Sequence, residues 1–163
     1  MPNISERISL ECETIDVAEI VTHRPSDWML PFFRIASEEG DQIGVGLRSA
    51  MRSTLVKASS PKNVHVEIGE PRQVVGGAIE VPFRWRATGY QSLFSMFDGR
   101  LVVWASARRK TQLAVEGVSD VPAEITDDVL GATAAMRATE AAARSLLSKL
   151  KVALEERLRT QRR

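Results

Sequence analysis

The sequence predicts an α+β domain in which a curved antiparallel sheet of about five to seven strands wraps on a long C-terminal helix. Two features carry this prediction. Residues 64–118 contain runs in which apolar and polar side chains alternate, separated by turn residues. Residues 128–159 contain one glycine and no proline and are rich in Ala, Leu, Arg and Glu, which is typical of a long helix. A strand and two short helices are expected before the sheet.

Composition limits the class of protein. The chain has 163 residues, of which 44% are hydrophobic, so a single domain over residues 1–163 with a real core is expected. Charge is nearly balanced, with 22 Lys and Arg against 21 Asp and Glu, which does not favour nucleic acid as a partner. The single cysteine fits a reducing compartment. Neither a leader peptide nor a membrane-spanning run is evident, so we expect a cytoplasmic protein without integral membrane association, and a homodimer stays open.

The elements before the sheet follow from local patterns. Residues 8–17 alternate between apolar and polar side chains and predict the first strand. Ser26 or Asp27 is expected to cap a short helix over residues 28–37, with Pro31 in its first turn. A second helix is predicted over residues 41–58, because apolar side chains recur there every four positions. These side chains are Ile43, Leu47, Met51 and Leu55.

The sheet region is divided by turn signals. A strand over residues 64–68 is expected to be interrupted by Gly69 and Pro71. Gly76-Gly77 is a two-residue hairpin signal, because both glycines can take positive φ, and Asp98-Gly99 is read as a second turn. Further strands are expected over residues 100–107 and 111–118, with residues 108–110 turning the chain between them.

One stretch, "AIEVPFRWRATG" at residues 78–89, poses the functional question. Phe83 and Trp85 fall on one face of the predicted strand, while Arg84 and Arg86 fall on the other. The aromatic side chains therefore cannot act together with these arginines on one nucleic-acid surface, and that reading is disfavoured. Two readings stay open: the aromatic face lines a pocket for an apolar small molecule, or it is ordinary core.

The C-terminal helix has an uneven apolar stripe. Its first half contains mostly small residues and its second half contains mostly leucine. Alanines either allow closer packing of the helix or leave an apolar void against the sheet, and both alternatives stay open. The residues predicted to form the buried stripe are Val129, Met136, Ala143, Leu147, Leu150 and Leu154.

The predicted order of elements resembles the helix-grip arrangement of the START-like, or SRPBCC, superfamily, which includes polyketide cyclases, lipid-transfer domains and plant ligand binders. The local resemblance to bacterial members is best in "VPFRWRATG", "LFSMFDGRLVV" and "TQLAVEGV". In two places the chain departs from the family pattern. "GVSDVPAE" stands where relatives often carry a Tyr-Pro-Pro-like turn, and helical "GLRSAMRSTLVKA" stands where a long family strand is expected. The resemblance implies a cavity between a curved sheet and the last helix, and it implies no particular reaction.

The leading hypothesis is therefore binding of a hydrophobic or aromatic small molecule, such as a lipid, polyketide or isoprenoid-like compound, with no cofactor and no metal. An alternative is a polyketide cyclase or dehydratase-like enzyme in which Glu140 is the acid–base group, unless Glu140 only pairs with Arg137 or Arg144. A third reading is a protein-interaction module without a ligand. His23, His65 and Cys12 are expected to have no catalytic role. The candidate ligand-binding residues are Phe83, Trp85, Phe94, Met96, Trp104, Leu113, Met136, Thr139, Glu140 and Ala143.

Overall fold

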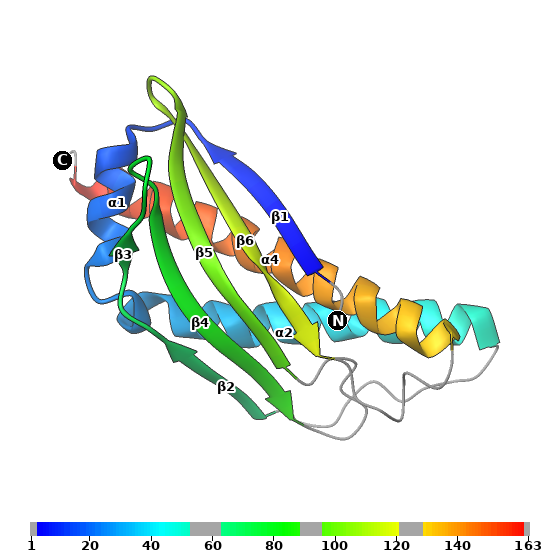
Figure 1. Ribbon diagram of the computed structural model, residues 1–163. Coiled ribbons are helices and arrows are strands. Elements are labelled where there is room, and N and C mark those ends of the chain that lie inside the picture. Colours follow the sequence, from blue (N-terminus) through cyan, green and yellow to red (C-terminus); the bar gives the residue numbers. More distant parts are fainter. Residues whose placement is uncertain (1–2, 53–62, 89–95, 121–128, 162–163) are drawn as a thin grey trace.

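The computed structural model describes residues 3–52, 63–88, 96–120 and 129–161, and in these residues six strands form one sheet that packs against helices. Helices α2 and α4 lie side by side across one face of the sheet (Figure 1). This arrangement confirms the predicted α+β helix-grip fold. The elements are β1 (Asn3–Leu10), α1 (Thr14–Thr22), α2 (Pro25–Arg52), β2 (Asn63–Ile68), β3 (Arg72–Gln73), β4 (Ile79–Thr88), β5 (Met96–Ala107), β6 (Lys110–Asp120) and α4 (Val129–Gln161).

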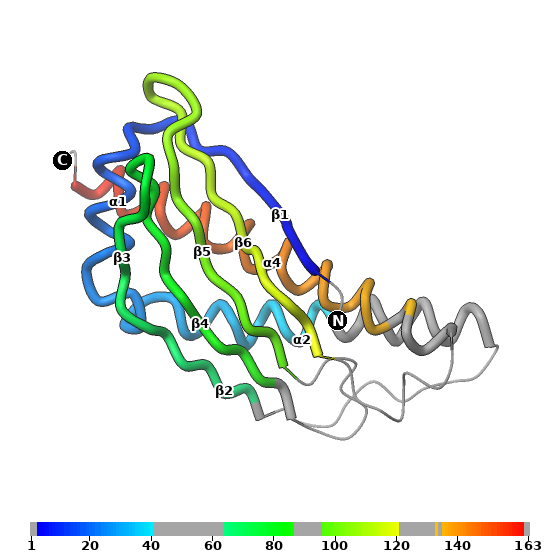
Figure 2. Tube along the Cα trace, in the orientation of Figure 1, coloured from blue at the N-terminus to red at the C-terminus, as the bar shows by residue number. Residues whose placement is uncertain are grey.

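The sheet is antiparallel throughout, with strand order β1-β6-β5-β4-β2, and the short strand β3 also pairs with β4. The meander predicted over residues 64–118 is confirmed, and β1 joins it beside β6 (Figure 2). Trp85 of β4 stands opposite Phe97 of β5 and Val66 of β2. The register therefore brings large apolar side chains of three strands to the face that the helices cover.

Three of the predicted breaks in the sheet are confirmed. Gly76 and Gly77 have φ of 92° and 83° and form the turn between β3 and β4. Gly69 and Pro71 separate β2 from β3, although both strands pair with β4. The chain also turns between β5 and β6 where predicted, at Arg109, whose φ is 58°.

The turn predicted at Asp98-Gly99 is wrong, because both residues lie within β5. Gly99 stands opposite Gly117 of β6. The ring of Phe97 and a backbone oxygen of β6 occupy the space that a Cβ at Gly99 would need. This glycine therefore serves close packing inside a strand, a requirement that the local sequence does not reveal.

The N-terminal elements need three corrections. The first strand ends at Leu10, and residues 14–17, predicted as strand, belong to α1. The two short helices predicted over residues 28–37 and 41–58 are instead α1, which is short, and α2, which has 28 residues. Pro31 lies inside α2 rather than in its first turn. Burial against α4 explains why α2 continues past Gly40, where its own sequence weakens it.

Helices α2 and α4 approach each other very closely. A Cβ added at Gly40 would lie 2.5 Å from the backbone oxygen of Ala138 and 2.7 Å from the Cβ of Ala142. Glu39 receives a hydrogen bond from Ser145 and lies 3.1 Å from Lys149 Nζ. Ala138 and Ala142 of α4 thus serve close packing, with helix α2 as the partner. No described helix has both the length and the apolar character needed to span a bilayer.

Candidate functional site

Four aromatic side chains form a cluster between the sheet and helix α2. Phe83 and Trp85 project from β4, Phe97 projects from β5, and Phe33 reaches them from α2. The ring of Phe33 makes edge-on contacts with those of Phe83 and Trp85, at centroid distances of 5.0 and 5.1 Å. Phe97 stacks on Phe83 at 5.8 Å. Each of the four side chains is at most 4% exposed, so this aromatic cluster lies wholly in the interior.

Buried hydroxyl groups interrupt the otherwise apolar interior. Thr139 of α4 donates a hydrogen bond to the backbone oxygen of Ala135 at 2.9 Å, and its oxygen lies 3.2 Å from that of Ser119 on β6. Ser37 of α2 is fully buried one helical turn after Phe33, and its hydroxyl has no hydrogen-bond partner among the described residues. Because an unsatisfied buried hydroxyl destabilises a fold, this group needs a physical explanation.

Several of the predicted site residues are buried in the interior. Phe83, Trp85, Leu113, Thr139 and Ala143 are all buried. Of the helix stripe, Ala143 and the three leucines at positions 147, 150 and 154 are buried as predicted. A role for any of these residues in binding stays a prediction.

Other predicted residues lie elsewhere. Trp104 is half-buried on the outer face of the sheet, where the guanidinium carbon of Arg7 lies 5.6 Å from the ring centroid. Met136 is 39% exposed and does not belong to the buried stripe, which corrects that prediction. Met96 is half-buried at the start of β5. Phe94 lies outside the described residues, as does the side chain of Val129.

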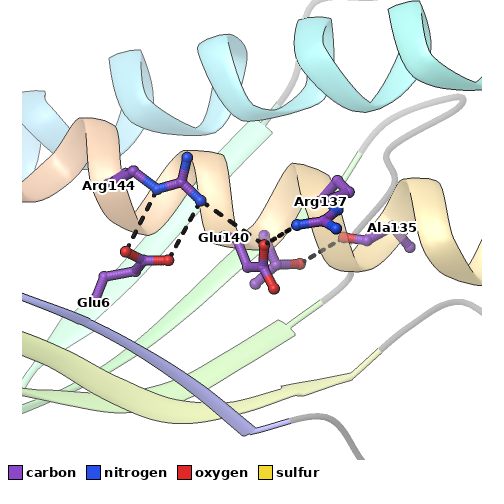
Figure 3. A network of polar contacts seen from close by, with 6 residues as sticks. Glu6, Ala135, Arg137, Glu140 and Arg144 are labelled. Atoms are coloured by element: carbon purple, nitrogen blue, oxygen red, sulfur yellow. Dashed lines mark hydrogen bonds and ion pairs between the residues drawn. The ribbon is translucent and has the colours of Figure 1, made fainter.

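Glu140 lies at the surface of α4 in a chain of ion pairs (Figure 3). One carboxylate oxygen is 3.2 Å from Arg137 and 3.8 Å from Arg144. Arg144 in turn lies 3.4 Å from Glu6 of β1. The structure therefore contains the simpler of the two alternatives drawn from the sequence, in which Glu140 pairs with the two arginines.

The other candidates for chemistry are also placed. Cys12 is buried, as its position in the pattern predicted, and its Sγ lies 3.9 Å from Thr111 Oγ1. His65 is exposed beside Glu67 and His23 is exposed after α1. Among the residues that the structure describes, no group of histidine, cysteine and acidic side chains is suited to hold a metal ion.

Sequence reasoning missed a groove on the outer face of the sheet, with a volume of about 820 Å³. Its charged groups are paired: Arg84 lies 2.8 Å from Asp98, and Arg100 lies 3.2 Å from Glu116. The hydrogen bond to Asp98 raises the pKa of the Arg84 guanidinium above its usual value. Glu80, the one buried carboxylate among the described residues, also lies 2.9 Å from Arg100. Such mutual pairing is typical of a solvated sheet surface.

Helix α2 was not predicted from the sequence to contribute side chains to this interior. Phe33 and Ser37 were not among the predicted site residues, although they are four positions apart and therefore share one face of a helix. That spacing was the available signal. The spacing was not used because the helix was predicted to stop before Gly40 rather than to continue along α4.

The chain matches no protein-family model and no curated protein. Among solved structures it is similar to the Zhui aromatase/cyclase from Streptomyces sp. R1128, with 12% identity, a TM-score of 0.43, and 96% of this chain and 95% of that chain covered. It is also similar to TTHA0849 from Thermus thermophilus, with 11% identity, a TM-score of 0.38, and 93% and 99% covered. Ara h 8.0201 has 13% identity, a TM-score of 0.24, and 90% and 98% covered. These are likenesses of fold alone.

Proposed function

We propose that the protein binds a hydrophobic or aromatic small molecule between the inner face of the sheet and helices α2 and α4. The ligand classes expected are lipids, polyketides and isoprenoid-like compounds. The observation that carries the proposal is the Ser37 hydroxyl, which is fully buried one helical turn after Phe33 of the aromatic cluster and has no hydrogen-bond partner among the described residues. A single polar group on a ligand would provide the missing partner.

The composition of the interior supports a binding role over a purely structural one. An unsatisfied buried hydroxyl costs about 1–3 kcal/mol, whereas alanine at that position would cost nothing. Ala36, the preceding residue, is also fully buried, so this part of α2 accommodates alanine. Functional sites commonly retain groups that lower stability, because those groups act on the ligand. An apolar pocket with a few placed polar groups is the usual form of a small-molecule site.

Binding is also better supported than catalysis. The enzyme hypothesis assigned acid–base chemistry to Glu140, whose carboxylate is engaged by two arginines at the surface of α4. Among the described residues, the one buried carboxylate is that of Glu80, which pairs with Arg72 and Arg100 on the outer face. The aromatic cluster therefore has no acid–base group beside it in the part of the chain described. We place this binder in the cytoplasm, a proposal that rests on the single cysteine.

The proposal is tested with two probes that differ by one hydroxyl group, 2-phenylethanol and ethylbenzene, titrated by calorimetry. We expect the wild-type protein to bind both. The preference for 2-phenylethanol over ethylbenzene should fall about 2–10-fold in Ser37→Ala, the factor that one net hydrogen bond provides. The same substitution should stabilise the unliganded protein by about 1 kcal/mol, because it removes an unsatisfied polar group.

Ser119→Ala is the matched control, because Ser119 is equally buried but its hydroxyl is hydrogen-bonded to Thr139. We expect this variant to lose stability and to leave the preference between the probes unchanged. If Ser37→Ala keeps the full preference, the hydroxyl does not contact the ligand. If neither probe binds at any accessible concentration, the proposed function is wrong.

A further inference from the structure

The aromatic cluster contains one ring that does not come from the sheet. Phe33 projects from α2, is fully buried, and meets the rings of Phe83 and Trp85 edge-on, with interplanar angles of 66° and 87°. Edge-to-face contacts at centroid distances of about 4.5–7 Å are the favoured geometry for aromatic pairs. A ring brought by a ligand would make the same contacts with the same two side chains.

Helix α2 is held in place mainly by contacts other than this ring. Its backbone touches α4 closely at Gly40, and Glu39 binds Ser145 and Lys149 of α4. Its backbone approaches the sheet chiefly at the edge strand β2. The middle of α2 is therefore attached to α4 independently of the Phe33 ring.

The segment of α2 that carries Phe33 has weak points of its own. Pro31, two residues earlier, has no backbone N–H, so the carbonyl oxygen of Asp27 lacks its intrahelical hydrogen bond. Arg24, which precedes the helix, has a φ of 44°, a conformation that is strained for a residue with a side chain. Both features lower the local stability of the segment near the N-terminus of α2.

We propose that Phe33 occupies the position that the aromatic ring of the ligand takes, so that the ligand ends in an unsubstituted six-membered aromatic ring and displaces Phe33 on binding. The polar group of the ligand should lie on the side of this ring that faces Ser37, whose Cβ is about 5–6 Å from that of Phe33 because the two residues are four positions apart in a helix. This inference rests on the proposed function and specifies the class of ligand and the group that competes with it.

The test compares 2-phenylethanol with 2-cyclohexylethanol, which carries the same hydroxyl on a saturated ring. Phe33→Ala should bind 2-phenylethanol at least about tenfold more tightly than wild type, because the competing ring is gone, and should gain less than about threefold for 2-cyclohexylethanol. Phe32→Ala is the matched control, because Phe32 is the adjacent residue of α2 and is outside the aromatic cluster. Its affinities should equal those of wild type.

A second measurement avoids removing a core side chain. With 4-fluorophenylalanine incorporated at position 33 of the otherwise unchanged protein, addition of 2-phenylethanol should shift the fluorine resonance toward that of a solvated ring. The same label at position 32 should not respond. This readout stays informative if Phe33→Ala does not fold.

The outcomes separate the two proposals. If wild type binds 2-phenylethanol but the label at position 33 does not move and Phe33→Ala binds no tighter, Phe33 is ordinary core and the function stands. Equal gains for the saturated and aromatic alcohols would overturn the assignment of an aromatic ring. If only Phe33→Ala binds 2-phenylethanol, or if neither wild type nor any variant binds it, both this inference and the proposed function are overturned.

Discussion

The close approach of helices α2 and α4 makes a prediction opposite to the one that helix propensity makes. Replacing Gly40 by alanine in the interior of a helix normally stabilises by about 1 kcal/mol. Here the added Cβ would lie 2.5 Å from the backbone oxygen of Ala138 and 2.7 Å from the Cβ of Ala142, where ordinary contacts exceed 3 Å. The backbone oxygen cannot rotate away, so the two helices must separate.

The expected change in stability is the balance between the better helix propensity of alanine and the cost of the close contacts. Overpacking a well-packed core costs about 1–3 kcal/mol, and separating the helices also weakens their contacts along the shared interface. We expect Gly40→Ala to lower the free energy of unfolding by about 1–2 kcal/mol despite its better propensity. For a domain of this size the melting temperature should fall by about 2–8 °C.

Urea and thermal unfolding monitored by circular dichroism measure this change. The double variant Gly40→Ala with Ala142→Gly removes the contact between the two Cβ atoms and keeps the contact with the Ala138 oxygen. It should therefore recover part of the loss relative to the sum of the two single variants, giving a coupling of about 0.5–1 kcal/mol. A Gly40→Ala protein as stable as wild type, or more stable, would refute the close helix crossing.

Three further predictions concern polar groups. A hydrogen bond from Ser145, together with the ammonium group of Lys149, lowers the pKa of Glu39 from its ordinary 4.5. The stabilisation that ionised Glu39 gives is therefore present above pH 4.5 and is lost as the pH falls through the lowered pKa. Glu39→Gln should have a lower urea midpoint than wild type at about pH 7 and an equal midpoint at about pH 2. Thr111→Val should lower the free energy of unfolding by about 1–3 kcal/mol in chemical denaturation, because the buried Thr111 hydroxyl donates a hydrogen bond to the carbonyl oxygen of Cys12. A variant with the same free energy of unfolding as wild type, within experimental error, would contradict that role. Glu140→Gln should change stability by less than about 1 kcal/mol and leave the affinity for 2-phenylethanol unchanged in calorimetry, whereas lost binding would reopen the enzyme hypothesis.

The parts of the fold that follow from local physics were predictable. The period-two pattern placed Phe83 and Trp85 on the covered face, and the glycines at 76 and 77 marked a turn that requires positive φ. The C-terminal helix was predicted to within two residues at each end, because it lacks breaks over its whole length. In each case the determining information lies within a few residues of the chain.

What was missed depends on residues far apart in the sequence. Ala138 and Ala142 of α4 pack against Gly40, about 100 positions away, so the local pattern did not distinguish close packing from a void. The same long-range contact carries α2 past a glycine at which it was expected to have ended. Asp98 and Gly99 have the composition of a turn, but the ring of Phe97 lies over Gly99 inside a strand.

Native mass spectrometry of the protein purified from its own host, followed by denaturing extraction and identification of bound compounds, shows whether the interior carries a ligand. We expect a stoichiometric apolar compound with a terminal aromatic ring and a polar group near it. The extracted compound should also compete with 2-phenylethanol in calorimetry. A protein that carries no compound and binds neither aromatic probe would contradict the claim that this interior is a ligand site.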